Sequence, residues 1–268
     1  MNLIKSKDFK KVLLKLGIKK NSCCFIHSSI INLGVFEDKK IENIPKNIFK
    51  ILKNITSPNG TISTLSANYE YGNKNKIFDL SKSLPTHEIG DFSKFFVKKK
   101  NSSRSINPIF NITAVGKKSK YITSSINPTS FGEDSSWDRL FKLNSDIIFL
   151  GCDLNVCTFI RFIEFRYGVP YLYNKFFKTK IRKNGKIISN FSCSPLRYKG
   201  SISYYNLKKF QKILIKKKVL KVIKDKNFSI MSMKMQPCFK IGTELLKKDI
   251  HFFLKSKPKY KKNHSPYR

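Results

Sequence analysis

Apolar residues recur at two different spacings along the chain, and these spacings predict alternating strands and helices. Short apolar runs at 23–26, 61–65 and 146–150 are typical of buried strands. The segment 45–55 has helical spacing instead, with a Pro in its first turn and apolar residues at Ile48, Phe49, Leu52 and Ile55. The first strand, this helix and the second strand predict a β-α-β unit, in which a parallel or mixed sheet is covered by helices.

The remaining pattern completes an α/β fold. We expect an amphipathic helix within 1–20, a helix over 91–98, a strand over 109–115, a helix capped by Ser135, a β-hairpin of 176–182 with 186–191, a helix capped by Asn206 and a helix starting near Thr243. The predicted fold is a three-layer sandwich with a central mixed sheet covered by helices and a hairpin excursion in the C-terminal half. We expect a single domain over 1–255 and a basic, flexible tail over 256–268.

The charge of the chain is strongly positive. It contains 54 Lys and Arg against 17 Asp and Glu, a formal net charge of +37. Clustered cations are typical of nucleic-acid binding, and a nucleic-acid-binding basic protein is one alternative. The lysines are dispersed over the whole chain, however, and no zinc-finger or RNP-type motif accompanies them. We therefore favour a generally basic surface without specific nucleic-acid binding, which would also attract an anionic cofactor.

The six cysteines do not indicate a metal site. They form no CxxC pair, and no His has the spacing of a zinc ligand. Free thiols in a reducing compartment are expected. No apolar run approaches the ~20 residues that a membrane-spanning helix needs, so we predict no membrane span and a cytoplasmic location.

The segment Cys157–Tyr171 carries the candidate chemistry. It is predicted to be the end of a loop followed by a short helix, on which Arg161 and Glu164 are three residues apart and share a face. Such a pair is either catalytic or substrate-holding, or a surface ion pair that contributes little energy. The residues alone favour the surface ion pair.

Five blocks in order resemble the aminoglycoside 3-N-acetyltransferase family, and the resemblance extends from about Phe25 to Leu254. Its polysaccharide-linked, low-GC members are the most similar in character. The blocks are His27-Ser28-Ser29 with Leu33-Gly34, Pro58-Asn59-Gly60-Thr61, Arg104-Ser105-Ile106-Asn107-Pro108 with Val115-Gly116, Phe131-Gly132-Glu133-Asp134-Ser135, and Gly151 with Thr158 to Glu164 and Gly168-Val169-Pro170-Tyr171.

The resemblance implies a fold, an activity and a cofactor site. It implies an N-acetyltransferase that moves an acetyl group from acetyl-CoA to an amine of an aminoglycoside or an amino sugar. The residues that would hold acetyl-CoA are His27, Ser28, Ser29, Gly34, Arg104 and Ser105. A turn of small residues exposes backbone N–H groups, and an Arg offers a forked donor to phosphate, so this assignment agrees with the chemistry of the residues.

The chain departs from the family at the catalytic position. The family has a His paired with a carboxylate there, and this chain has Arg161, although Glu164 matches the carboxylate. A guanidinium stays protonated at neutral pH and cannot act as a general base. Glu164, His27 or His87 are alternative bases, and Glu164 would need its pKa raised by burial. The other alternative is a catalytically impaired member that binds CoA or a glycan intermediate.

The acceptor and the assembly stay open in the sequence. A polycationic antibiotic suits so basic a protein poorly, which favours a less charged or nucleotide-linked amino sugar for polysaccharide biosynthesis over antibiotic resistance. Local carboxylates decide this question, and the candidates for an acidic patch are Glu133, Asp134, Asp138 and Asp153. We expect direct transfer in a ternary complex, with Cys157 as a packing residue, and leave a homodimer open.

Overall fold

The computed structural model describes residues 3–37, 40–73, 76–197, 205–225 and 227–258. Its largest sheet has seven strands, in the order β11 (Lys221–Asp225), β12 (Phe228–Lys234), β8 (Asp146–Leu150), β2 (Cys23–Ser28), β4 (Thr61–Leu65), β7 (Ile112–Gly116) and β6 (Ser103–Arg104). Strand β2 pairs in parallel with β4 and β8, and the other neighbours are antiparallel. The predicted mixed sheet and its β-α-β unit are thus confirmed.

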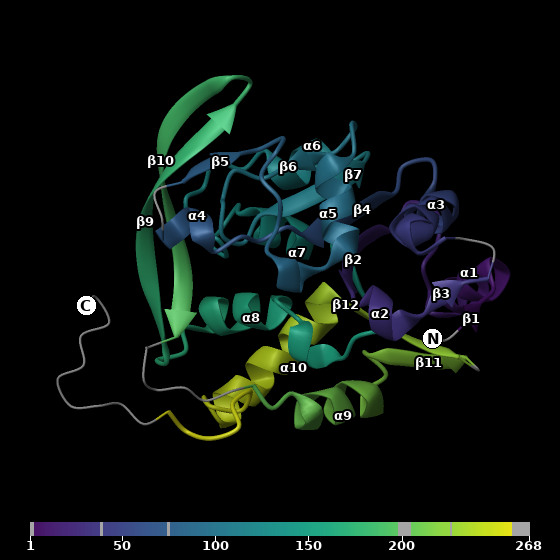
Figure 1. Ribbon diagram of the computed structural model, residues 1–268. Coiled ribbons are helices and arrows are strands. Elements are labelled where there is room, and N and C mark those ends of the chain that lie inside the picture. The colour runs from purple at the N-terminus through teal and green to yellow at the C-terminus, as the bar shows by residue number, and fades with distance from the viewer. Residues whose placement is uncertain (1–2, 38–39, 74–75, 198–204, 226, 259–268) are drawn as a thin grey trace.

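Helices cover both faces of this sheet, which gives the predicted three layers (Figure 1). One face packs against α1 (Ser6–Lys15), α3 (Ile44–Thr56) and α5 (Asp91–Lys98). The other face packs against α7 (Ser136–Lys142), α8 (Phe159–Tyr167), α9 (Lys208–Lys216) and α10 (Met235–Lys248). Strand alternation divides the two cores, because Cys24 and Ile26 face the first layer while Phe25 faces the second.

A long hairpin forms the excursion that the sequence predicted. Strands β9 (Leu172–Lys183) and β10 (Lys186–Arg197) pair along their whole length, and β5 (Ile77–Asp79) adds to β9 in parallel. The turn between them contains Asn184 and Gly185, both with positive φ, as a two-residue hairpin turn requires. The hairpin runs along one side of the molecule and extends past β5 (Figure 1).

The smaller elements complete the chain. They are β1 (Leu3–Ile4) paired with β3 (Val35–Phe36), α2 (Ile30–Leu33), α4 (Glu70–Asn73), α6 (Ser119–Thr123) and the 3₁₀ turns Ile41–Asn43, His87–Ile89 and Leu154–Val156.

Two sequence predictions about local structure are corrected, and two strands were missed. Asn206 does not cap α9; its backbone N–H donates to the carbonyl of Phe253 instead, and Leu207 occupies the N-cap position. The last helix begins at Met235 rather than near Thr243. Strands β11 and β12 were not predicted. The predicted tail, 256–268, falls outside the described residues from position 259 onward.

Candidate active site

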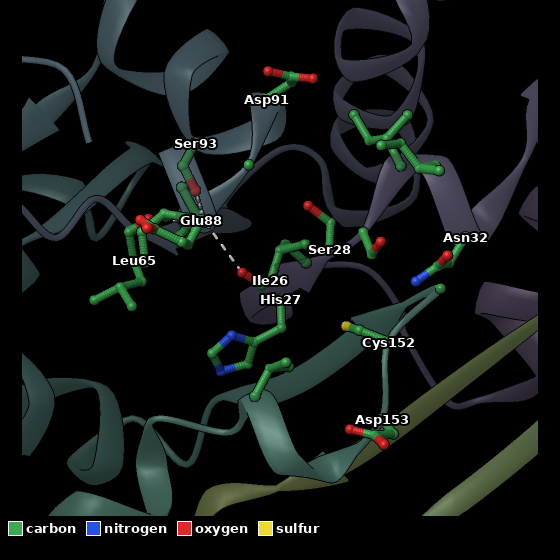
Figure 2. Close-up of a pocket in the computed structure, with 18 of the residues that line it drawn as sticks. Ile26, His27, Ser28, Asn32, Leu65, Glu88, Asp91, Ser93, Cys152 and Asp153 are labelled. Carbon is green, nitrogen blue, oxygen red and sulfur yellow. Dashed lines mark hydrogen bonds between the residues drawn. The ribbon is translucent and has the colours of Figure 1, made fainter. Parts of the chain in front are cut away.

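A cavity of about 1030 Å³ opens where β2, β4 and β8 end. These three strands are parallel, so their carboxyl ends meet at one edge of the sheet, where ligands of open α/β sheets bind. The cavity is lined by His27 and Ser28 at the end of β2 and by Ser29 after it. After the end of β8, Gly151 and the two residues that follow it also line the cavity (Figure 2). His27 and Ser28 project to opposite sides of β2, as adjacent strand residues do.

Gly151 lets the two strand ends approach each other. Its φ is +66°, and a Cβ at this position would lie 2.4 Å from the backbone N of Leu33 and 2.6 Å from the carbonyl O of Ser29. Gly34 ends α2 with a φ of +115°, and its N–H donates to the carbonyl of Ile30. Both glycines therefore have backbone reasons to be glycine; Gly151 lines the cavity beside Ser29, whereas Gly34 is not among its lining residues.

His27 lies between the core and the cavity. Its ring stacks on Phe149 at 5.4 Å and meets the edge of Phe25 at 5.0 Å. Its Nε2 atom is buried without a hydrogen-bond partner among the described residues. Burial lowers the pKa of His27 to about 3, so the imidazole is neutral at physiological pH. The other candidate base, His87, is exposed and also lines the cavity.

Three carboxylates line the cavity in a chain that has few of them: Glu88, Asp91 and Asp153. Glu88 and Asp153 lie on opposite sides (Figure 2). Hydrogen bonds from its own backbone amide and from Thr86 lower the pKa of Glu88, so it is ionised at neutral pH. Lys94 and Lys224 line the cavity too, and Lys94 pairs with Asp91 at 3.1 Å, so Glu88 and Asp153 are the carboxylates that suit a cationic ligand.

The predicted acidic patch is only partly correct. Asp153 lines the cavity, whereas Glu133, Asp134 and Asp138 do not. Asp134 pairs with Arg139, and Asp138 pairs with Lys142 and Arg166, away from the cavity. Glu88 and Asp91 were missed, because they lie in a turn and a helix start whose position next to β2 depends on the fold.

Glu164 is buried on α8 and is held by two tyrosines. The hydroxyl of Tyr171 donates to its Oε1 at 2.9 Å, and the hydroxyl of Tyr205 donates to its Oε2 at 2.5 Å. Burial raises the pKa of Glu164, and this effect exceeds the lowering by the tyrosines and by Arg161. The carboxyl group is thus moved toward the pKa range of a general base.

Arg161 shares the helix with Glu164 but forms no ion pair with it. The backbone N–H of Arg161 donates to the carbonyl of Thr158, and its side-chain Nη1 is buried without a hydrogen-bond partner among the described residues. Thr158 lines the cavity, and so does Tyr69, whose pKa is influenced by the charge of Arg161. The two side chains thus form no direct contact pair, but they influence each other: Arg161 lowers the pKa of Glu164, and Glu164 raises the pKa of Arg161.

Arg104 and Ser105 lie away from the cavity. The guanidinium of Arg104 donates to Oδ1 of Asn111 at 2.7 Å, to the carbonyl of Ser66 at 3.0 Å and to the carbonyl of Ser83, and it packs on the ring of Phe78. The Ser105 hydroxyl accepts the N–H of Ile112 at 2.9 Å. Both side chains join loops to the sheet edge, and Arg104 also lines a second cavity of about 1190 Å³, so their predicted binding of cofactor stays a prediction.

The thiols near the cavity are protonated. Burial raises the pKa of Cys152, which lines the cavity, and of Cys157, which packs in the core, to about 12 each. In the ranges that the structure describes, no three His, Cys, Asp or Glu side chains gather as metal ligands. None of the helices in these ranges combines the length and apolar character that crossing a bilayer requires.

Comparison with known proteins places this arrangement in a family. The family model described as aminoglycoside 3-N-acetyltransferase matches residues 25–247. The chain belongs to this family. The family consists of acyltransferases, and its match includes the whole of the cavity edge and α8. No curated protein is a significant match to the chain.

Solved structures of this family share the fold of the chain. Aminoglycoside acetyltransferase AAC(3)-Xa superposes with a TM-score of 0.79 at 13% identity, covering 95% of both chains. AAC-IIIb in a binary complex with CoASH has a TM-score of 0.77 at 17% identity, covering 96% of this chain and 100% of that one. The YokD protein of Bacillus subtilis has a TM-score of 0.74 at 17% identity, covering 92% and 100%. A mutant of AAC(3)-IVa, solved in complex with gentamicin, has a TM-score of 0.75 at 20% identity, covering 94% and 92%.

Proposed function

We propose that the chain is an N-acetyltransferase that moves the acetyl group of acetyl-CoA to an amine of an aminoglycoside or an amino sugar. The observation that carries this proposal is the cavity at the carboxyl ends of β2, β4 and β8, which combines small residues on one strand end with carboxylates around it. Family membership supplies the reaction class, and the CoASH complex of AAC-IIIb supports the cofactor.

Ser28 and Ser29 are the proposed contacts of acetyl-CoA, with Gly34 and Gly151 shaping the backbone around them. Ser28 projects into the cavity (Figure 2). The hydroxyl of Thr158 makes no capping hydrogen bond to α8 and lines the same cavity, so it is the proposed donor to the thioester oxygen as negative charge develops there.

Glu88 and Asp153 are the proposed contacts of the acceptor amine, since Asp91 pairs with Lys94. Carboxylates attract an ammonium group, and these would do so in a chain whose overall charge repels it. The local lining thus supports a cationic acceptor despite the net charge of +37.

The acceptor must lose a proton before its nitrogen attacks the thioester. Arg161 cannot take this proton, because a guanidinium remains protonated. We propose that one of two cavity histidines takes it: His87, or His27, whose Nε2 has no hydrogen-bond partner among the described residues but whose pKa of about 3 makes it the weaker base. The protonated thiols of Cys152 and Cys157 favour direct transfer over an acyl-cysteine intermediate.

The test is release of free CoA thiol when acetyl-CoA is incubated with a panel of aminoglycosides and amino sugars. Comparison of His27→Asn and His87→Asn then identifies the base, since loss of a general base lowers kcat by about 10²- to 10⁴-fold. If neither change lowers kcat, both histidines are excluded as the base.

A second candidate function is a family member that binds CoA or a glycan intermediate without turnover. Arg161 at the position of the family His favours it. Binding of CoA without thiol release would support this reading.

A cytoplasmic location belongs to the proposal as well, because the six cysteines are free, as is typical of a reducing compartment. The homodimer stays a prediction.

A further inference from the structure

The guanidinium of Arg161 lies in a buried position without a partner. Its Nη1 atom is shielded from solvent, and no hydrogen bond or ion pair of this side chain is formed within the part of the chain that the structure describes. An unpaired buried donor is costly, and a charged donor more so, which is why such groups in native proteins need an explanation.

Glu164 forms no ion pair with Arg161, although the charge of Glu164 raises the pKa of Arg161 against the effect of burial. Its two oxygens accept from Tyr171 and Tyr205, and both hydroxyls stay protonated because burial raises the pKa of each phenol above its ordinary value. The guanidinium of Arg197 lies 3.9 Å from the centre of the Tyr205 ring, so a second cation is near the same carboxyl group.

Other shielded arginines of this chain show what a structural arginine looks like. Arg104 uses all of its guanidinium nitrogens as donors to Asn111 and two backbone carbonyls. Arg139 donates to Asp134 through two nitrogens and to Tyr121 and Ser124 through the third. Arg161 has none of these contacts, so holding the fold together does not account for it.

The position of Arg161 connects it to the cavity. It follows Thr158 by one helical turn, and its charge lowers the pKa of Tyr69. Tyr69 and Thr158 both line the cavity, and the charge of Glu88 raises the pKa of Tyr69. The cavity thus has carboxylates in its lining, and Arg161 follows one of its lining residues, Thr158, by one helical turn.

We propose that Arg161 binds an anionic oxygen group of the acceptor, and that the acceptor is an amino sugar carrying both an ammonium group and a phosphate or carboxylate. This rests on the proposed function. A planar guanidinium pairs with such groups through forked hydrogen bonds, which would satisfy Nη1. An acceptor with amines alone would leave Nη1 unpaired. The replacement of the family His by Arg161 would then change the acceptor class.

The test compares two acceptors that differ by one anion. Initial rates of acetyl-CoA-dependent transfer are measured for glucosamine 6-phosphate and for glucosamine. The wild type is expected to have a kcat/KM about 10- to 100-fold higher for the phosphorylated acceptor. For Arg161→Gln, kcat/KM should become nearly equal for the two acceptors, mainly because KM for glucosamine 6-phosphate rises. Arg161→Lys keeps part of the preference, because its charge remains without the fork.

Arg166→Gln is the matched control, since Arg166 is on the same helix but pairs with Asp138. It should leave the preference unchanged. Thermal melting of each variant separates loss of the anion contact from loss of the fold.

Calorimetry gives a readout that needs no turnover. Glucosamine 6-phosphate titrated into CoA-saturated wild type should bind, and Arg161→Gln should weaken that binding about 10-fold or more. Equal efficiency with both acceptors, an unchanged preference in Arg161→Gln, or weaker CoA binding with an unchanged acceptor KM would each overturn the inference. Absence of CoA binding would instead overturn the proposed function.

Discussion

The hydroxyl of Tyr205 donates a hydrogen bond of 2.5 Å to Oε2 of Glu164, which lies 41 positions earlier in the chain. This bond fixes the buried carboxylate from outside its own helix. Hydrogen bonds to charged groups contribute about 1.5–3 kcal/mol. We therefore expect Tyr205→Phe to lower the free energy of unfolding by about this amount, measured by urea denaturation at pH 8.

Tyr171→Phe removes the other donor to Glu164 and is the natural comparison. The double variant should lower the free energy of unfolding by less than the sum of the two single changes, because the carboxyl group becomes protonated once both donors are lost. Strict additivity would contradict the shared-carboxylate account.

His27 should make the protein sensitive to acid. Its folded pKa of about 3 lies below the unfolded value of 6.5, so the folded state binds fewer protons between these values. Its contribution to stability is complete above pH 6.5 and is lost as the pH falls toward 3. At pH 4.5 the loss is about 2–3 kcal/mol.

The variant His27→Phe keeps an aromatic ring between Phe25 and Phe149 but cannot be protonated. Its unfolding free energy, compared between pH 7 and pH 4.5, should fall by about 2–3 kcal/mol less than that of the wild type. An identical pH dependence in both proteins would show that folding does not lower the pKa of His27.

Gly151 should tolerate no side chain. Alanine there would be strained by the φ of +66° and would meet the backbone of Leu33 and Ser29 at less than 3 Å. Gly185 has a similar φ of +77° but nothing within 4 Å of a Cβ. Gly185→Ala should cost about 1–2 kcal/mol, the strain alone, whereas Gly151→Ala should cost clearly more. Thermal or urea unfolding of the pair measures the difference, and equal costs would exclude the backbone contact as the reason for Gly151.

Asp153 should attract the acceptor amine. Asp153→Asn preserves the size of the side chain and removes its charge, so we expect KM for a cationic acceptor to rise about 3- to 10-fold with little change in kcat. The rise should shrink at high salt. Asp134→Asn, outside the cavity and paired with Arg139, is the control. If both variants raise KM equally, the effect comes from net charge rather than from the cavity.

Much of the fold was predictable because its signals are local. The strand at 23–28 and the helix at 44–56 follow from apolar spacing and a proline in the first helical turn. Strand β12 was missed because it is defined by pairing with β8 and β11, which no local pattern encodes. The start of the last helix was misplaced for the same reason, since Met235 follows that strand directly.

The site was predictable only where neighbours in sequence are neighbours in space. Ser28 and Ser29 follow a strand, and the structure places them at the cavity. The shared face of Arg161 and Glu164 was correct, but the partners of Glu164 are tyrosines far away in the chain. Arg104 belongs to one of the family motifs, but its guanidinium donates to backbone carbonyls in distant loops, which the motif could not reveal.

The most direct test of the central claim is isothermal titration of CoA into the wild type and into Ser28→Trp, whose indole would occupy the part of the cavity at the end of β2. The account predicts binding to the wild type and a loss of at least about 10-fold in affinity in the variant, with both proteins folded. Absence of CoA binding to the wild type, or equal binding to both proteins, would contradict it.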